Sequence, residues 1–455
     1  MSHCRLSRRG LPLLIVLLLA ASASAEWNEK VLYSFQGGSV GQNPAGGVVF
    51  DKQGNLYGAT TYGGLEVCAI GGECGTVFEL SPPVRKGDSW TETVIYEFQG
   101  QGVNDGGVPV GGLIIDALGN LYGTTAYGGS GGCVVLGLRA GCGTVYELSP
   151  PKQTGEPWNE TILYSFQGGD DGDFPWGNLT FDSKGNLYGA TQFGGGRGNT
   201  CDAFYGGNCG TAFKLSRTKQ KGGAWVEQIL HSFAGGTDGS IPNGSLVLDS
   251  KGAVYGATSY GGNEQGVCNG GGCGTVFELK PATKGTGAWR EKIIHLFMDG
   301  NDGAGPNGGV IFDDKGLLYG GAGGGSKGGG VVFRLASAGG GKWKETTVYE
   351  FYSDTYGFNP GVSHFDSRHN LYGTTQYFPD AYSGSVFRLQ PPTQETKHWT
   401  LTFLHKFDGL SGDGIAPYPQ LANDSAGSLF GATERGGNTQ ACYPGGCGVV
   451  FEVSY

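Results

Sequence analysis

The apolar and polar positions of this chain follow one short pattern that returns many times. In residues 109–166 an apolar run ending in Asp116 leads into a tight turn, and alternating runs follow at 121–127, 143–149 and 158–166. Alternation with a period of two, bounded by Gly, Pro and Asp, is typical of half-buried strands joined by hairpin turns. No window shows the period of an amphipathic helix. The pattern therefore predicts four antiparallel strands per unit and almost no helix.

A Trp residue opens the last strand of each unit and shows how often the unit returns. The regularly spaced residues are Trp27, Trp90, Trp158, Trp225, Trp289, Trp343 and Trp399. Their spacing of roughly 54–68 residues is typical of repeat proteins in which each repeat is one supersecondary unit. A repeat of four short strands is the pattern of a β-propeller blade, which packs with other blades around a central channel.

The two ends of the chain indicate how such a ring closes. Residues 449–453 match the third strand of a unit without a fourth, whereas residues 27–35 match a fourth strand without a unit. Because an unpaired edge strand exposes its backbone groups, the simplest closed ring pairs the N-terminal strand with the C-terminal blade. We expect an all-β, seven-bladed β-propeller of four-stranded antiparallel blades, forming a single domain over 26–455. Its blades cover roughly 43–98, 108–166, 174–233, 242–297, 306–351, 360–407, and 417–455 plus 27–35.

The first 25 residues indicate that the protein is exported. Residues 1–25 have a basic start, a short apolar stretch and an Ala-x-Ala cleavage site ending at Ala25, which together predict a signal peptide. The pair Arg8-Arg9 leaves a twin-arginine signal open as an alternative to general secretion. The 91 Gly residues stand beside regularly spaced aromatic residues, so they indicate turns between strands.

Charge narrows the possible partners. The formal net charge is -10, and removing the three Arg residues of the signal peptide makes it -13. An acidic surface without a basic cluster argues against nucleic acid and against anionic membranes as partners. No second long apolar stretch follows the signal peptide. We expect a secreted, extracellular monomer with no membrane span.

The repeated phrases carry a family resemblance. Tandem runs such as GNLYGTT (119–125), GTVYEL (143–148) and WNETILYSF (158–166) resemble the GloVer (Gloeobacter–Verrucomicrobia) tandem-repeat family of exported bacterial proteins. The resemblance covers nearly the whole mature chain and implies an exported location, but it implies no particular activity. Members of the family often carry a C-terminal sorting anchor. This chain differs by ending at Tyr455, so we expect release from the cell and not retention at its surface.

The cysteines form close pairs in equivalent loops. Apart from Cys4 in the signal peptide they are Cys68/Cys74, Cys133/Cys142, Cys201/Cys209, Cys268/Cys273 and Cys442/Cys447, and two repeats lack both members. Joint presence and joint absence predict local disulfide bonds in an exported protein. The alternative is metal binding, but these loops contain no His or further Cys to complete a four-ligand set.

The loops that enter the first strand of each blade and the cysteine loops should share one face, where ligand-binding loops are usually found. The residue after each loop Pro varies, and Trp176, Asn243, Asn307 and Tyr418 would suit a sugar, because aromatic faces stack on it and amides bond its hydroxyls. The alternative is that these side chains only plug the channel. Aromatic residues also end the second strands on this face, either as a platform or as packing between blades: Tyr62, Tyr127, Phe193, Tyr260 and Tyr377.

One repeat breaks the pattern of second-strand aromatics. In the last repeat, the position that ends the second strand holds Arg435, preceded by Glu434. Such a break in symmetry is what catalysis needs, although a solvated ion pair is the commoner outcome. The sequence alone does not place Glu434 and Arg435 near Trp176, because their blades lie on opposite sides of the ring.

The loop acids and the histidines are considered as metal ligands and as catalytic residues. Asp170, Asp171 and Asp173 offer calcium ligands but match no complete calcium loop, so we assign no metal ligand and no cofactor. The strand residues His231, His295 and His405 stand where other repeats have Tyr, which indicates packing. His364 and His369 have no evident nucleophile or carboxylate partner in the sequence. No catalytic triad, glycosidase carboxylate pair or phosphate loop is present in the sequence, and no catalytic residue is assigned.

These observations favour an exported binding or scaffold module whose ligand is an extracellular glycan or another surface protein. The alternative is a secreted propeller enzyme, a polysaccharide or small-molecule lyase or hydrolase, with its site on the loop face. In a binding module, equivalent positions of the repeats should carry similar residues. An enzyme gathers the unusual residues Trp176, Tyr418, Glu434 and Arg435 in one cleft.

Overall fold

The computed structural model of the chain describes residues 26–455 except 69–71, 86, 101–103, 154, 197–208, 219–222, 263–267, 269–270, 282–287, 354–357, 378–382, 410–411, 439 and 443–444. The predicted signal peptide and Cys201 lie outside the described residues. Within them the chain forms β-strands and two short 3-10 turns, η1 (Gly38–Val40) and η4 (Gly236–Asp238). None of these residues forms a helix long and apolar enough to cross a membrane. The prediction of an all-β fold is confirmed.

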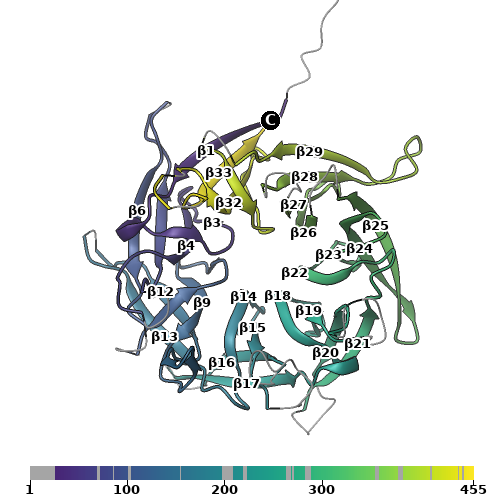
Figure 1. Ribbon diagram of the computed structural model, residues 1–455, viewed down its shortest axis with the longest axis horizontal. Helices are drawn as coiled ribbons and strands as arrows, with labels where there is room; N and C mark the ends of the chain where they lie inside the picture. The colour runs from purple at the N-terminus through teal and green to yellow at the C-terminus, as the bar shows by residue number, and fades with distance from the viewer. Residues whose placement is uncertain are drawn as a thin grey trace, which may run out of the picture.

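Antiparallel sheets surround a central axis in a propeller-type arrangement (Figure 1). The first contains β2 (Gln42–Pro44), β3 (Val49–Phe50), β4 (Leu56–Tyr62), β5 (Thr76–Ser81) and β6 (Thr91–Glu97). The second contains β7 (Gly106–Pro109), β8 (Ile114–Ile115), β9 (Leu121–Gly128), β12 (Thr144–Ser149) and β13 (Asn159–Ser165). Between β9 and β12 lies a small hairpin of β10 (Val134–Val135) and β11 (Leu138–Arg139). The third contains β14 (Asp173–Phe181), β15 (Leu187–Phe193), β16 (Thr211–Arg217) and β17 (Trp225–Ser232).

The fourth and fifth repeats share one eight-stranded sheet. Its first half contains β18 (Ser240–Leu248), β19 (Val254–Tyr260), β20 (Thr275–Lys280) and β21 (Arg290–Leu296). Its second half contains β22 (Ala304–Phe312), β23 (Leu318–Gly323), β24 (Gly328–Gly339) and β25 (Lys342–Tyr352). The sixth repeat forms β26 (Phe358–Phe365), β27 (Leu371–Tyr377), β28 (Ser385–Gln390) and β29 (Thr400–Lys406). The last forms β30 (Gly414–Pro417), β31 (Ala422–Asn423), β32 (Leu429–Gly436) and β33 (Val449–Ser454), which pair with β1 (Asn28–Ser34).

Five repeats therefore form separate sheets and the fourth and fifth share one, which differs from the seven separate sheets that a seven-bladed ring leads us to expect. The fourth and fifth repeats join through a single parallel bridge between Ser245 of β18 and Gly309 of β22. The cause is local. A side chain at Gly244 would come within 2.2 Å of the backbone nitrogen of Gly309, so only glycine lets the two inner strands approach this closely.

The predicted pairing of the two chain ends is confirmed. Strand β1 pairs antiparallel with β33, from Asn28 opposite Ser454 to Ser34 opposite Val449 (Figure 1). Beyond the strand, the backbone N–H of Phe35 donates to the carbonyl of Gly448 at 3.1 Å. The edge of the last sheet is therefore covered by residues from the other end of the chain.

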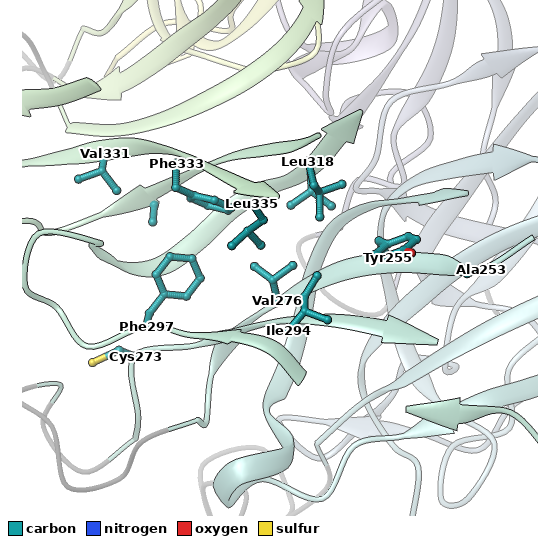
Figure 2. Packing of buried hydrophobic residues seen from close by; sticks show 12 residues of the cluster. Ala253, Tyr255, Cys273, Val276, Ile294, Phe297, Leu318, Val331, Phe333 and Leu335 are labelled. Atoms are coloured by element: carbon teal, nitrogen blue, oxygen red, sulfur yellow. The ribbon is translucent and has the colours of Figure 1, made fainter. Parts of the chain in front are cut away.

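One aromatic contact recurs between successive repeats. The Phe that follows or ends the last strand of a repeat packs edge-on or tilted against a ring on the third strand of the next, with centroids 5.0 to 5.3 Å apart. The pairs are Phe35–Phe78, Phe98–Tyr146, Phe166–Phe213, Phe233–Phe277, Phe297–Phe333, Phe351–Phe387 and Phe407–Phe451. Figure 2 shows this contact between the two halves of the eight-stranded sheet, where Val276 and Leu335 pack beside Phe297 and Phe333. The apolar core thus lies mainly between neighbouring repeats.

A Gly–Pro contact accompanies the aromatic one and explains a repeated glycine. The Gly before each third strand has a positive φ, and the loop Pro of the following repeat lies over it. At Gly75, for example, an added Cβ would be 2.5 Å from Cδ of Pro109. At the closure of the ring the equivalent pair is Gly448 and Pro44, at 2.4 Å. At Gly75 the carbonyl oxygen of Thr60 in the same repeat would also be only 2.4 Å away, so this Gly is required both by its own second strand and by the next repeat.

Candidate functional site

The entry into each inner strand has an unusual backbone. The residue before each loop Pro has a positive φ even where it is not glycine, as at Val108 (60°), Phe174 (59°) and Ile241 (54°). Branched and aromatic residues rarely adopt this conformation, which costs on the order of 1–3 kcal/mol. The N–H of Phe174 donates to the carbonyl of Cys142 in the preceding repeat at 3.1 Å. This bond holds the strained residue and directs the following residues towards the axis.

The loops that accept these bonds are fixed by disulfides. The structure contains the bonds Cys68–Cys74, Cys133–Cys142, Cys268–Cys273 and Cys442–Cys447. Cys209 is disulfide-bonded as well, although Cys201 lies outside the described residues. The prediction of local disulfides is confirmed for the four fully described pairs. Each places a carbonyl acceptor under the inner strand of the next repeat, so the disulfides stiffen the rim of one face.

At the axis, the side chains that follow the loop Pro residues surround a cavity of about 320 Å³. Trp176, Asn243, Asn307 and Tyr418 all line it. The amide of Asn307 donates to Oε1 of Gln376 at 3.0 Å. The sequence-predicted ring of variable residues is thus brought together, partly by hydrogen bonds that the sequence does not reveal.

A wider opening of about 950 Å³ continues from this cavity, and we call it the mouth groove. It shares Val110, Trp176, Gln376 and Tyr418 with the axial cavity. Its other lining residues include Gln42, Asn43, Tyr62, Glu73, Val108, Tyr127, Phe174, Glu434 and Arg435. The four residues that an enzyme would gather, which the sequence could not place together, therefore line one groove. They meet because the inner strands converge at the axis.

Aromatic rings dominate one wall of the mouth groove. Phe174 stacks on Trp176 with ring centroids 5.6 Å apart and planes 9° apart. Tyr127 meets Phe174 edge-on at 5.3 Å. Of the residues that end the second strands, Tyr62 and Tyr127 line the groove. The half-exposed Tyr260 is not among the lining residues of the groove.

Polar groups face these rings from the first and last repeats. Arg435 pairs with Glu434 at 3.2 Å, and the guanidinium is about half exposed. Glu73 accepts hydrogen bonds from the amide of Gln42 at 2.7 Å and the backbone N–H of Gly63 at 2.8 Å. Sequence reasoning missed Glu73 and Gln42. The signal available was that Glu73 is an acid inside a cysteine loop, a position that faces the mouth once the disulfide forms.

The loop carboxylates and the strand histidines meet in the crevices between repeats. The Tyr96 hydroxyl donates to Asp105 at 3.0 Å, and Tyr164 donates to Asp171 at 2.6 Å. In later repeats His231 replaces the Tyr and lies 3.1 Å from both oxygens of Asp238. The histidines therefore act as polar partners of a loop acid, beyond the packing role expected from the sequence.

The loop acids considered for calcium have different neighbours. Asp171 is engaged by Tyr164, whereas Asp173 lies beside the Cys133–Cys142 disulfide. Burial raises the pKa of Asp173 to about 6. Within the described part of the chain, Asp170, Asp171 and Asp173 do not bring their oxygens together in one group.

His364 and His369 lie on the sheet face that carries the hairpin turns, in an opening shared with Asp314. His364 stacks on Tyr372, and Ser363 Oγ lies 3.1 Å from its Nδ1. Burial lowers the pKa of His364. The same Ser363 hydroxyl bonds both the carbonyl and the N–H of Leu421, so it is committed to the backbone of the next repeat.

Comparison with known proteins identifies the repeat and the fold. The family model of the Gloeobacter/Verrucomicrobia repeat matches residues 21–269 and 266–455. No curated protein sequence matches the chain.

Solved structures resemble the chain only distantly. A fungal alcohol oxidase in complex with copper is similar over 94% of this chain and 76% of its own, at 14% identity and a TM-score of 0.51. An ulvan lyase of a new polysaccharide lyase family covers 88% and 91%, at 12% identity and 0.48. A periplasmic gluconolactonase from Pseudomonas aeruginosa covers 86% and 98%, at 13% identity and 0.45. At these identities the likeness concerns the fold alone.

Proposed function

Because this chain belongs to the Gloeobacter/Verrucomicrobia repeat family, a family named for its repeat, we propose from the site itself that it is an exported propeller that binds a polysaccharide in the mouth groove. The observation that carries the proposal is the combination of Trp176, Tyr62 and Tyr127 with amide side chains in one opening of about 950 Å³. Flat aromatic rings beside fixed hydrogen-bonding groups are the arrangement that recognises a sugar, whose faces are apolar and whose rim carries hydroxyls.

The rigidity of the groove supports binding without large rearrangement. Phe174 is held by its bond to Cys142 and in turn stacks on Trp176. A preformed aromatic wall loses little conformational entropy when a ligand arrives. A surface protein is the other ligand that the groove would fit, and the experiment below separates the two.

Catalysis on a polysaccharide or small molecule is the second candidate, as a lyase or hydrolase. What favours it is that Trp176, Tyr418, Glu434 and Arg435 line the same groove, although Glu434 and Arg435 come from a different position of the repeat than the other two. A cation beside carboxylates can stabilise a developing negative charge. The close pairing of Arg435 with Glu434 weighs against it, because the guanidinium is already neutralised.

We also propose seven blades, an exported location and a single domain over 26–455. The two halves of the eight-stranded sheet touch through one bridge and are otherwise packed like other repeats, which supports counting them as two blades. The disulfides support an oxidising compartment.

The test is a pull-down of the mature protein on insoluble polysaccharides, with supernatants assayed for reducing sugar and for unsaturated uronate. Retention without released product supports the binding proposal. Released product establishes the enzyme instead. If no polysaccharide retains the protein, the glycan proposal is wrong and a protein ligand remains.

Variants of the groove locate the site. Trp176→Ala and Tyr62→Ala should each weaken retention about ten-fold, since an aromatic contact of roughly 1.4 kcal/mol corresponds to that factor. The matched control is Tyr260→Ala, which removes the equivalent second-strand aromatic from outside the groove. Equal losses in Tyr62→Ala and Tyr260→Ala would place the binding surface elsewhere.

A further inference from the structure

The crevices between repeats contain one recurring arrangement of three polar residues. A Tyr or His near the end of the last strand faces an Asp in the loop into the next repeat, and a Glu on the last strand of that next repeat completes the set. Members with Tyr are Tyr96–Asp105–Glu160 and Tyr164–Asp171–Glu227; members with His are His231–Asp238–Glu291, His295–Asp302–Glu345 and His405–Asp413–Glu29.

In two of these sets the ligand atoms gather closely. One nitrogen of His231 and one oxygen each of Asp238 and Glu291 lie within 4.8 Å of one another, and the same holds for His405, Asp413 and Glu29. In both sets Oε1 of the Glu is buried and has no hydrogen-bond partner among the described residues. A buried carboxylate oxygen without a partner is costly, so these crevices lack a positive group or a proton.

We propose that the His231–Asp238–Glu291 and His405–Asp413–Glu29 crevices are two divalent-cation sites of the zinc class. One imidazole nitrogen and two carboxylates are ligands that Zn²⁺ accepts, with a fourth position left to water. His231 Nε2 already lies 3.1 Å from the Asp238 oxygens. Ligand atoms around tetrahedral zinc are ~3.3 Å apart, so only the Glu carboxylate moves appreciably on binding.

Backbone hydrogen bonds orient the proposed ligands, and partial exposure of the side chains lets a cation enter from solvent. The N–H of Ala234 donates to Oδ2 of Asp238 at 2.7 Å and leaves Oδ1 for the cation. The side chains of His231 and Asp238 are 19% and 24% exposed, so the crevice can be entered from solvent. At the second site, the N–H groups of Asp408 and Gly414 donate to Oδ2 and Oδ1 of Asp413 at 2.9 and 2.7 Å, which orients the carboxylate and leaves each oxygen a second lone pair for the cation.

The two Tyr sets share the unpartnered oxygen, at Oε1 of Glu160 and of Glu227, but they offer a phenol where the proposed sites have an imidazole nitrogen. Burial raises the pKa of Tyr96 and of Tyr164, so neither phenol provides an anionic ligand at neutral pH. His295 has its acid, Asp302, at 3.1 Å, but Glu345 is engaged by the hydroxyl of Thr347 and the three do not gather within 4.8 Å. These sets are internal controls for the proposal, which is independent of what the mouth groove binds.

Zinc titrated into chelator-treated mature protein should bind at two ions per chain by calorimetry. His231→Tyr and His405→Tyr should each leave one ion, and the double variant none. Both substitutions install the residue found at Tyr96 and Tyr164, so the crevice keeps a hydrogen-bond donor to its Asp. His295→Tyr is the matched control and should still bind two.

A second variant keeps the test decisive if a tyrosine disturbs the packing. Glu291→Gln keeps the shape of the side chain and should also remove one ion. Zinc should raise the melting temperature of the parent, and His405→Tyr should lose most of that rise, because Glu29 lies on the strand that closes the ring. No uptake, uptake unchanged in both His variants, or an equal loss in His295→Tyr would each overturn the proposal.

Discussion

Replacing Phe35 by Ala tests whether the seam between the two chain ends is packed like any other interface of the ring. The Phe35 side chain is fully buried, and its ring meets Phe78 edge-on at 5.1 Å and 65°. Around it lie Leu32, Val48 and Val450, which come from both ends of the chain. Removing a buried Phe ring typically costs about 3–5 kcal/mol, because burial is lost and a cavity stays behind. We expect that loss in the free energy of unfolding.

The chain offers a matched control for this variant. Phe166 is equally buried, and it meets Phe213 at 5.1 Å and 66°, between two repeats that the chain connects directly. Phe166→Ala removes the same contact away from the seam. If the seam is closed as described, the two variants should agree to within about 2 kcal/mol, which is the usual spread at fixed chemistry.

The assay is equilibrium unfolding in denaturant, followed by tryptophan fluorescence, with the slope of the transition compared between variants. An unchanged slope licenses the comparison of the two free energies. The reasoning is refuted if Phe35→Ala costs less than about 1 kcal/mol while Phe166→Ala costs the expected amount. That result would mean that the N-terminal strand is already detached in the folded protein.

Three further outcomes are expected. Gly448→Ala should destabilise the protein more than Gly54→Ala in thermal melts, because both have φ near +90° but only at Gly448 would a Cβ press on Pro44. Burial, and then the nearby Asp171, raise the pKa of Glu227 from 4.5 to about 8, so its stabilising contribution is complete below about pH 4.5 and is lost as the pH rises towards 8. Glu227→Gln should therefore make the free energy of unfolding less dependent on pH in that window. If the free energy of this variant changes with pH as steeply as that of the parent, the raised pKa of Glu227 is refuted. The unreduced mass should fall below the reduced mass by two hydrogens per disulfide, and equal masses would exclude the bonds.

The sequence predicted much of the fold because each repeat is specified locally. The alternating runs and Asp–Gly turns determine strands and hairpins. In the turn after β3, for example, Asp51 accepts bonds from the N–H groups of Gln53 and Asn55 and from the Asn55 side chain. The pairing of β1 with β33 followed from the same logic, since one end lacked a strand that the other supplied. The local cysteine pairs were equally accessible, because their partners lie close in sequence.

Contacts between repeats were not accessible in the same way. The sequence did not predict that the fourth and fifth repeats share a sheet, because this depends on two glycines that are far apart in the chain, Gly244 and Gly309. Glu73 was missed as a groove residue, and His231 was assigned only to packing. Each acquires its role from a neighbour in a different repeat.

The sequence by itself determined the repeating unit, the strand character of its four runs and the disulfide pairs, because these depend on neighbours within a few tens of residues. Only the tertiary structure decided which unusual side chains share a space. Trp176 and Arg435 are 259 positions apart, and they line one groove because the ring brings their strands to a common axis. A side chain's own repeat fixes its place in a strand, whereas the closed ring fixes what stands opposite it.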